Sequence, residues 1–577
     1  MSATVDSRWL VAALAQEVHD FVICAGSRSA PLTYAVADAE AAGILRAHPF
    51  FDERAAGFFA LGLAQSTGRP VAVVTTSGTA PAHLLPAVIE AFHTNAPLIV
   101  ISADRPFEMH GVGASQTTRQ DDLFGSHVVS LLDVPAGLGI SPTAHSISED
   151  AAAKSLVGRV RRLLASAMGV RGGAPGLGGP AHINMGLRDP LVPQPGEPSV
   201  ADLDVGSWDA VRQTVGSAPA WEDVVEPLRT VIIAGDKAGT LASELAQAAG
   251  VPLLAEPSSG AFGMPGWIAH QQQMLTHFGD EVEQVVVLGH PSLSRPVTRL
   301  LAKDDVRVIV CSQKPDYTDV FGNASVVVDS IKPAVSPMPM QDWAEKWVQR
   351  SAQITRQLSA LKLPDGARAA KSVWAHYASD PSHALVLGAS NPIRFVDLVA
   401  SEPIKLSAKA LPAMEIGPVH AARGQAGIDG TIATAKGISV GLDMPVRVLV
   451  GDLTFMHDMN SLINRAGEQP PNVDVVVIDD RGGRIFKSLE HGLADADLYE
   501  RFFAIGHDLD YRALAESAGW EYLSIDYQDT EAESDLDQAL SAAPSGRIIH
   551  VRANHENIRD EIRSLFSDNV QELKRNA

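Results

Sequence analysis

Two strand-like runs in the last third of the chain lead directly into acidic turns. A run at 447–451 leads into Asp452, and a second apolar run leads into a glycine-containing turn that starts at Asp479. In open α/β sheets, anionic ligands bind where strands end and helices begin. Either aspartate alone is best explained as a cap of the following helix. Both together favour a divalent-cation site that can hold a diphosphate, and we predict Asp452, Asp480 and the backbone carbonyl of Gly482 as its ligands.

A glutamate near the N-terminus lies among aromatic residues. Glu53 is flanked by Phe50, Phe51, Phe58 and Phe59. Apolar neighbours raise the pKa of a carboxyl group toward neutrality, and such a group exchanges protons readily. A solvated turn is the simpler interpretation of this short charged segment taken alone. In this apolar setting Glu53 is nevertheless a candidate catalytic carboxyl group, and the family resemblance described below implies that role.

Several arginines lie on turns that glycine or proline marks. They are Arg28, Arg105, Arg295, Arg394 and Arg423. Any one of them is more often part of a surface ion pair, which contributes little. In a chain this acidic, the joint pattern favours the binding of carboxylate ligands, because a guanidinium group pairs with a carboxylate through two parallel hydrogen bonds.

Length and composition restrict the classes of protein that fit. With 577 residues, the chain is too long for one hydrophobic core. Its net charge of −22 argues against nucleic acid and anionic membranes as partners. The two cysteines, Cys24 and Cys311, lie in apolar runs and are expected to be buried free thiols. The sequence has neither an apolar run long enough to span a bilayer nor a basic, apolar leader, so we expect a cytoplasmic protein.

Strands alternate with helical segments along the chain, which predicts parallel sheets flanked by helices. Proline-rich stretches at Val192–Ser199 and Lys332–Pro339 separate three α/β blocks, at 1–190, 200–339 and 340–577. The predicted strands are Asp20–Cys24, Pro70–Thr76, Pro97–Ala103 and Ala181–Met185 in the first block, Thr230–Gly235, Gln284–Gly289 and Val306–Cys311 in the second, and Ala384–Gly388, Arg447–Asp452, Val473–Asp479 and Arg547–Val551 in the third.

Short motifs in both terminal blocks resemble those of the MenD family. These are the thiamine diphosphate (ThDP)-dependent 2-succinyl-5-enolpyruvyl-6-hydroxy-3-cyclohexene-1-carboxylate synthases of menaquinone biosynthesis. The motifs are Gly26-Ser27-Arg28-Ser29, Phe51-Asp52-Glu53-Arg54, Thr76-Ser77-Gly78-Thr79, Ala103-Asp104-Arg105-Pro106, Gly427-Ile428-Asp429-Gly430, Gly451-Asp452-Leu453 and Gly482-Gly483-x-Ile485-Phe486. The central block resembles the family only weakly.

The resemblance implies a fold, an activity and an assembly. The three blocks would be a pyrimidine-binding domain, a central domain and a diphosphate-binding domain. The chain would be a transferase that decarboxylates 2-oxoglutarate on ThDP and adds the succinyl carbanion equivalent to isochorismate. It would need Mg²⁺ or Mn²⁺. The cofactor would lie between the first domain of one subunit and the third of another, in a homodimer or homotetramer.

The resemblance also implies roles for individual residues. Glu53 would activate the cofactor. The other cofactor-binding residues would be Ser390, Ile428, Asp452, Leu453, Gly482, Ile485 and Phe486. The metal ligands would be Asp452, Asp480 and Gly482. The substrate-binding residues would be Ser27, Arg28, Arg105, Gln116, Arg295, Arg394 and Arg423.

One departure from the family pattern affects the metal site. The family commonly has two asparagines where this chain has Asp479 and Asp480. A second carboxylate should strengthen cation binding while it repels the diphosphate, and Arg481 and Arg484 would offset that repulsion.

Two other functions share parts of this pattern. Another ThDP-dependent carboligase or decarboxylase would act on small monocarboxylates and would not need this set of arginines. A non-catalytic ThDP-fold binding protein would tend to lose the glutamate or the metal-binding aspartate, and this chain keeps both Glu53 and Asp452.

Overall fold

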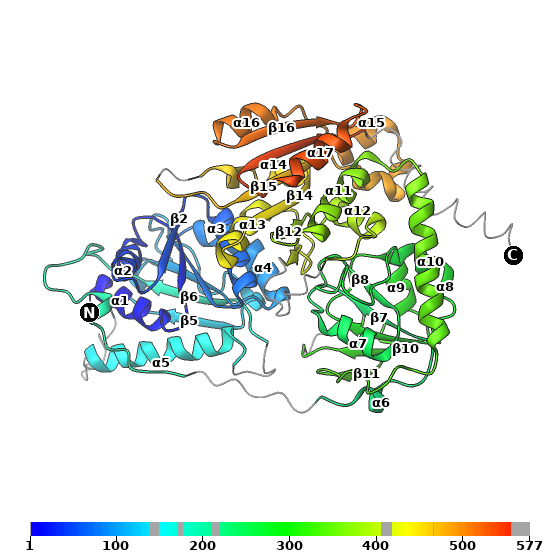
Figure 1. Ribbon diagram of the computed structural model, residues 1–577. Helices are drawn as coiled ribbons and strands as arrows, with labels where there is room; N and C mark the ends of the chain where they lie inside the picture. The colour runs from blue at the N-terminus through cyan, green and yellow to red at the C-terminus, as the bar shows by residue number, and fades with distance from the viewer. Residues whose placement is uncertain are drawn as a thin grey trace. The chain divides into compact units, whose positions relative to one another are not determined.

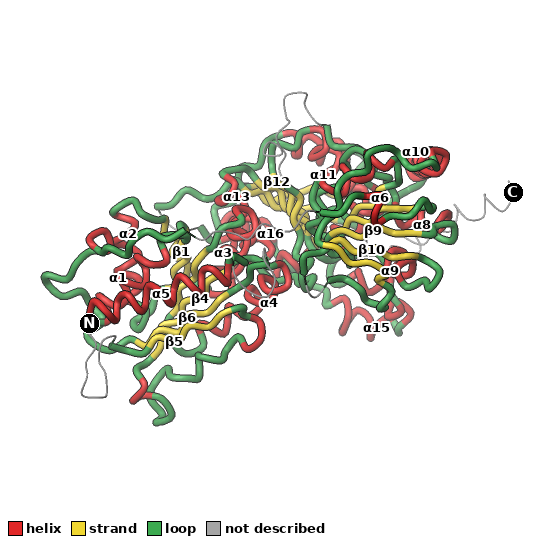
Figure 2. Tube along the Cα trace, turned by 90° about the horizontal axis from the view of Figure 1, so that it is seen from below, coloured by secondary structure: helices red, strands yellow, loops and turns green. Residues whose placement is uncertain are grey.

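A computed structural model of the chain describes residues 2–137, 149–170, 177–209, 218–314, 317–405, 418–464 and 467–554. These residues form three parallel β-sheets, each flanked by helices, as Figure 2 shows. The predicted α/β class is therefore confirmed. The chain divides into a first unit, Met1–Thr214 with Ala433–Asp443, and a second unit, Val215–Ile432 with Met444–Ala577.

The first sheet belongs to the first unit and has the strand order β2-β1-β3-β4-β6-β5. Its strands are β1 (Asp20–Cys24), β2 (Arg46–Phe50), β3 (Val71–Thr75), β4 (Leu98–Asp104), β5 (Ser130–Val134) and β6 (Ala181–Gly186). The helices of this unit are α1 (Ala3–Leu14), α2 (Ala30–Ala41), α3 (Glu53–Thr67), α4 (Leu85–Thr94) and α5 (Glu149–Ala167). Helix α13 (Thr431–Leu442) also lies almost wholly within it.

Side chains of the first sheet alternate between two cores, as expected for strands that are covered on both faces. Phe21 and Ile23 of β1 pack with helices α1, α2 and α5. Val22 and Cys24 of the same strand pack with helices α3 and α4 on the other face (Figure 1).

The second sheet has the order β11-β10-β9-β7-β8 and belongs to the second unit. Its strands are β7 (Thr230–Ala234), β8 (Leu253–Ala255), β9 (Gln284–Leu288), β10 (Arg307–Cys311) and β11 (Ala324–Val328). The helices in this part of the chain are α6 (Trp221–Val224), α7 (Leu241–Ala249), α8 (Gln271–Phe278), α9 (Arg295–Leu301) and α10 (Gln341–Ala360).

The third sheet has the order β13-β12-β14-β15-β17-β16 and also belongs to the second unit. Its strands are β12 (Ala384–Leu387), β13 (Val419–His420), β14 (Val446–Gly451), β15 (Val473–Asp479), β16 (Glu521–Asp526) and β17 (Arg547–Arg552). Its helices are α11 (Asp365–Ser379), α12 (Asn391–Val399), α14 (Asp452–His457), α15 (Ala496–Tyr499), α16 (Tyr511–Ser517) and α17 (Ala532–Ser541). One continuous apolar core joins it to the second sheet, through residues such as Trp347, Trp374 and Leu449.

Every strand predicted from the sequence is present, to within a residue or two at its ends. One boundary differs at the predicted metal site, because Asp452 is the first residue of α14 and not the last of a strand. Cys24 and Cys311 are buried free thiols, as predicted. Within the described ranges, no helix has the length and apolar character needed to cross a membrane. The domain boundaries near residues 190–200 and 339–340 stay predictions.

Candidate cofactor and substrate site

The third sheet has a topological switch point between β12 and β14. Strand β12 pairs with β13 on one side and with β14 on the other, so the connections leave these two central strands in opposite directions. Parallel sheets bind ligands at the carboxyl ends of strands at such a point. Ser390 follows β12, and Asp452 follows β14. Both residues therefore lie where this fold class places its ligands.

A cavity of about 140 Å³ lies at this switch point. It is lined by Ser390, Asn391, Pro392, Phe395, Ile428, Gly451, Asp452, Leu453, Thr454, Ile478, Asp480, Gly482, Gly483, Arg484, Ile485 and Phe486. The structure thus brings together every cofactor- and metal-binding residue predicted for this part of the chain. Carboxylates and a glycine turn suit a cation with a diphosphate, while the aliphatic and aromatic side chains suit the rings of a cofactor.

The Asp452 carboxylate is buried and held by backbone donors. Its Oδ2 atom accepts a hydrogen bond of 2.6 Å from the backbone N–H of Gly482, and its Oδ1 atom accepts one of 2.6 Å from Leu453. Burial raises the pKa of Asp452, and the charge of Asp479 raises it further. The hydrogen bonds therefore fix the direction of the carboxylate, while burial and the charge of Asp479 disfavour its ionised form.

Asp480 is also buried, and its pKa is raised well above the usual value. Burial is the main cause, and the charge of Asp452 comes next. A buried carboxylate whose pKa is raised by a second carboxylate nearby is stabilised by a cation that offsets the two charges. The donor set of Asp452, Asp480 and nearby backbone carbonyls consists of oxygen atoms, which Mg²⁺ prefers. These residues therefore fit a divalent cation of that kind.

The turn that carries Gly482 needs glycine. Gly482 has a φ of +118°, and a Cβ atom there would lie 2.1 Å from the carbonyl oxygen of Ala504. The next residue, Gly483, donates a 2.6 Å backbone hydrogen bond to the same carbonyl. The segment after α15 thus packs directly on the turn and holds it in place.

Sequence reasoning gave no role at this site to two residues near Asp452, namely His507 and Asp479. The Nε2 atom of His507 lies 3.3 Å from Asp452 Oδ2 and 3.9 Å from Asp479 Oδ1. The Nε2 atom of His550 lies 2.8 Å from Asp479 Oδ2. No strand end or glycine turn marks His507 in the sequence, whereas Asp479 starts the predicted turn but was not predicted to have a role of its own.

Asp452, Asp479 and His507 offer ligand atoms within 4.8 Å of one another, so they are a second arrangement for a metal ion. We favour the pair Asp452 and Asp480 for a magnesium-like ion. The hydrogen bond to Asp452 raises the pKa of His507 and favours the ring form whose Nε2 donates a proton. A nitrogen that donates to Asp452 has no lone pair left for a cation. His507 is therefore a support of Asp452, and Asp479 lies on the other side of the contact with His507, at 3.9 Å.

Three predicted substrate arginines lie in the second unit. Arg394 donates two hydrogen bonds of 2.8 Å from Nη1 to the backbone carbonyls of Ala389 and Ser390. Burial lowers the pKa of Arg394, and the nearby Arg423 lowers it further. Arg423 is only 3% exposed, and its Nε and Nη1 atoms find no acceptor in the described part of the chain. Arg295, by contrast, has a side chain that is 69% exposed and pairs with Glu490 at 3.3 Å.

A buried arginine, Arg28, and a half-buried one, Arg105, lie near each other in the first unit. Arg28 donates a 2.7 Å hydrogen bond to the carbonyl of Leu187 and lies 3.5 Å from Asp189. Burial lowers the pKa of Arg28, and the charge of Arg105 lowers it further. The Nε atoms of Arg28 and Arg105 are buried without an acceptor among the described residues. Buried guanidinium nitrogens without acceptors suit an anionic ligand.

Of the other predicted substrate residues of the first unit, Ser27 follows β1, and Gln116 is bonded to Ser77, which follows β3. Ser27 is exposed on the turn after β1. The Nε2 atom of Gln116 donates a 2.8 Å hydrogen bond to the carbonyl of Ser77, and the Ser77 hydroxyl donates one of 3.0 Å to the carbonyl of Gln116. This sheet has its switch point between β1 and β3, so these residues also lie at a ligand-binding edge.

Glu53 is half-buried at the start of helix α3. The preceding residue, Asp52, caps the helix by accepting hydrogen bonds from the backbone N–H groups of Arg54 and Ala55. Of the neighbouring phenylalanines, Phe58 and Phe59 are buried, but Phe51 is 60% exposed. The expectation that all four phenylalanines surround Glu53 is therefore wrong for Phe51, because its side chain points to solvent in this chain.

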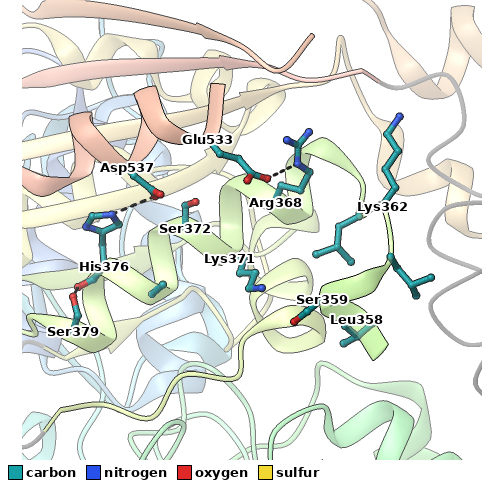
Figure 3. A pocket seen from close by; sticks show the side chains of 13 residues that line it. Leu358, Ser359, Lys362, Arg368, Lys371, Ser372, His376, Ser379, Glu533 and Asp537 are labelled. Carbon is teal, nitrogen blue, oxygen red and sulfur yellow. Dashed lines mark hydrogen bonds and ion pairs between the residues drawn. The ribbon is translucent and has the colours of Figure 1, made fainter. Parts of the chain in front are cut away.

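A second hollow of the second unit lies between helices α10, α11 and α17 (Figure 3). Its two acidic side chains are paired: Glu533 lies 2.6 Å from Arg368, and Asp537 lies 3.3 Å from His376. No predicted site residue lines this hollow, and it is therefore separate from the candidate site.

Comparisons with known proteins agree with this geometry. Residues 7–124 match the family described as thiamine pyrophosphate enzyme, N-terminal TPP binding domain. Residues 407–551 match thiamine pyrophosphate enzyme, C-terminal TPP binding domain.

The chain is also similar to curated proteins named 2-succinyl-5-enolpyruvyl-6-hydroxy-3-cyclohexene-1-carboxylate synthase. The protein of Paenarthrobacter aurescens (strain TC1) is 40% identical over 94% of this chain and 92% of its own length. The protein of Kineococcus radiotolerans (strain ATCC BAA-149 / DSM 14245 / SRS30216) is 40% identical over 94% of this chain and 94% of its own length. The protein of Mycobacterium marinum (strain ATCC BAA-535 / M) is 36% identical over 94% of this chain and 95% of its own length. The chain belongs to this synthase family. It is therefore a ThDP-dependent enzyme of the transferase class.

Proposed function

We propose that this enzyme decarboxylates 2-oxoglutarate on ThDP and adds the succinyl carbanion equivalent to isochorismate, a step of menaquinone biosynthesis. The observation that supports this most is the cavity between β12 and β14. There, Asp452 and Asp480 lie with the glycine turn and with apolar side chains that suit a cofactor ring. The high similarity to synthases of this name supports the choice of reaction.

Different residues of the cavity would bind different parts of the cofactor. Asp452, Asp480 and the carbonyl of Gly482 would bind Mg²⁺, or Mn²⁺ in its place, and the ion would hold the diphosphate. Ser390 and Leu453 would border the diphosphate. Ile428, Ile485 and Phe486 would pack against the rings.

Bound ThDP supplies the carbon nucleophile of the reaction. Glu53 would accept and return a proton at the aminopyrimidine ring, which is the proton transfer that makes this nucleophile available. Glu53 belongs to the first unit, and the cavity belongs to the second. We propose that a homodimer or homotetramer completes the site, with Glu53 of one protomer serving the cavity of its partner.

The arginines would bind the carboxylates of the two substrates. Both substrates are acids, and 2-oxoglutarate carries a second carboxylate. Arg28 and Arg105 in the first unit, together with Arg394 and Arg423 in the second, have buried or partly buried guanidinium groups. Ser27, Gln116 and Arg295 complete this proposed set. We also propose the domain boundaries 1–190, 200–339 and 340–577 for the pyrimidine-binding, central and diphosphate-binding domains.

A screen of 2-oxo acids tests this proposal. The enzyme should release CO₂ from 2-oxoglutarate much faster than from pyruvate, because pyruvate has no distal carboxylate for the arginines. A preference for pyruvate would instead indicate an acetohydroxyacid synthase or a related decarboxylase.

The Glu53→Gln variant tests the catalytic assignment in the same assay. It should lose nearly all turnover, because an amide cannot exchange the proton. Glu40→Gln is a matched control, since Glu40 is an exposed glutamate of the same unit that only accepts a hydrogen bond from the Ala47 N–H. Full carboligation by Glu53→Gln would refute the assigned mechanism.

A further inference from the structure

A buried carboxyl group of the second sheet has no role in the site described so far. Glu256 directly follows β8 and is 1% exposed. Its backbone N–H donates a 2.8 Å hydrogen bond to the carbonyl of Ala234 at the end of β7. Its main chain is therefore anchored at the carboxyl edge of the sheet, and its side chain is enclosed by protein.

The Glu256 side chain binds the loop that follows β9. Its Oε1 atom accepts hydrogen bonds from two consecutive backbone N–H groups, of Ser292 at 2.9 Å and of Leu293 at 2.7 Å. One oxygen atom thus fixes the course of the loop at two successive residues. Without this side chain, two backbone N–H groups, one of them buried, would lose their acceptor, so the loop conformation depends on Glu256.

The same loop carries groups that reach the proposed substrate arginines. The hydroxyl of Ser292 accepts a 2.7 Å hydrogen bond from Nη2 of Arg423. Two residues further on, the Ser294 side chain caps helix α9, whose first residue is Arg295. Glu256 is therefore connected to Arg423 through a single residue, and it fixes the segment that leads into Arg295.

The orientation of Arg423 matters because two of the nitrogen atoms of its guanidinium group donate no hydrogen bond to the described part of the chain. Its Nη2 atom is bonded to Ser292, whereas the buried Nε and Nη1 atoms have no acceptor among the described residues. Arg394 lies near it, since the charge of Arg423 contributes to lowering the pKa of Arg394. A carboxylate ligand supplies two oxygen atoms, which are the acceptors that the Nε and Nη1 atoms of Arg423 lack.

We propose that Glu256 is a positioning residue for substrate recognition: through the loop 292–295 it sets Arg423 and Arg295 to bind the distal carboxylate of 2-oxoglutarate. This inference rests on the proposed function. Glu256 does not touch the substrate, and its effect is on the choice between 2-oxo acids that carry a second carboxylate and those that do not.

The test compares two ligands that differ only in that carboxylate. The Michaelis constant of the enzyme for its substrate 2-oxoglutarate is measured together with the inhibition constant of the analogue 2-oxopentanoate, in which a methyl group replaces the distal carboxylate. Glu256→Ala and Ser292→Ala should each raise the Michaelis constant about tenfold or more and leave the inhibition constant of the analogue unchanged. Glu256→Gln should stay within about threefold of the parent enzyme, because its amide oxygen still accepts both N–H groups.

Ser243→Ala is the matched control. It removes the hydroxyl of a different serine in the same unit, one that is buried and donates a 2.7 Å hydrogen bond to the carbonyl of Pro265, and it should change neither constant. If Glu256→Ala does not fold, Ser292→Ala decides the question alone, since it leaves the buried carboxyl in place.

Three results would overturn the inference. They are an unchanged Michaelis constant in both alanine variants, an equal rise of both constants, or a Glu256→Gln variant that behaves like Glu256→Ala. A parent enzyme that does not act on 2-oxoglutarate would instead refute the proposed function, so the two failures are distinguishable.

Discussion

The Oδ2 atom of Asp452 lies 3.3 Å from Nε2 of His507 and also accepts a 2.6 Å hydrogen bond from the backbone N–H of Gly482. Two elements far apart in the sequence therefore fix one carboxylate oxygen. The glycine turn after β15 does so from one side, and the segment after α15 does so from the other. Partners that orient a metal-binding residue commonly affect metal affinity as strongly as some ligands do.

Replacing His507 should weaken metal binding. In His507→Ala the Asp452 carboxylate loses its side-chain donor, and we expect the dissociation constant of Mg²⁺ to rise about tenfold in the presence of ThDP. Isothermal titration calorimetry measures this directly, without reliance on turnover. His376→Ala is the matched control, because His376 lies at the same distance of 3.3 Å from Asp537 in a hollow that contains no site residue (Figure 3). Equal affinities for the parent and His507→Ala would contradict the supporting role.

Replacing Asp480 with asparagine should preserve activity but change the metal requirement. The variant keeps an oxygen ligand and loses one of two buried negative charges, so more Mg²⁺ should be needed for half-maximal rate. A titration of activity against Mg²⁺ concentration measures the change. An enzyme that stays inactive at saturating Mg²⁺ would show that the charge itself is essential.

A close contact between two helices of the first unit should not tolerate a methyl group. A Cβ atom on Gly437 of α13 would lie 2.0 Å from the carbonyl oxygen of Phe59 in α3, the helix that starts at Glu53. We expect Gly437→Ala to destabilise the protein by about 1–3 kcal/mol.

Thermal or urea unfolding measures this effect, and a second helical glycine provides the control. Gly158 in α5 has only the end of the Arg162 side chain nearby, at 4.0 Å. Gly158→Ala should therefore raise stability by up to about 1 kcal/mol through helix propensity. Equal changes in the free energy of unfolding of the two variants would mean that α13 can move away from α3 without cost.

The buried carboxyl of Glu256 should make stability depend on pH. Burial raises the pKa of Glu256 to about 8 in the folded chain. Between its ordinary pKa and this value, the folded state binds a proton that the unfolded state has lost. Stability should therefore fall as pH rises through this window, by about 1–3 kcal/mol between pH 5 and pH 8. Glu256→Gln removes the ionisation, so its unfolding free energy should fall less over the same range.

Unfolding curves of the parent and Glu256→Gln, recorded at several pH values, show how steeply the unfolding free energy of each protein falls with pH. Other buried carboxyls, such as Asp397, contribute to both proteins and cancel in that comparison. Identical slopes would show that Glu256 ionises in the fold as it does in water.

Regular, buried elements could be predicted from the sequence. Strands β1 and β15 are buried, largely apolar runs, and their predicted and observed bounds agree. Strand β2 was missed because it is largely solvent-accessible and contains Pro49, so it shows no apolar run. Strand β13 has only two residues, too few for a pattern.

Site residues could be predicted where they lie in a turn that follows an apolar strand. Asp452 and Asp480 each follow an apolar strand, and the structure places them in one cavity. His507 and Glu256 act through distant partners, namely Asp452 and the loop at Ser292. Such pairs depend on how strands are ordered in the sheet, and neither residue lies in a motif that a single sequence reveals.

The proposed reaction can be measured in one experiment. The protein is incubated with ThDP, Mg²⁺, 2-oxoglutarate and isochorismate, each left out in turn, and CO₂ release and the mass of the product are recorded. We predict CO₂ together with an adduct whose mass equals that of isochorismate plus 2-oxoglutarate less CO₂, formed only in the complete mixture. CO₂ release without that adduct, or an adduct formed equally well from pyruvate, would contradict the proposed function.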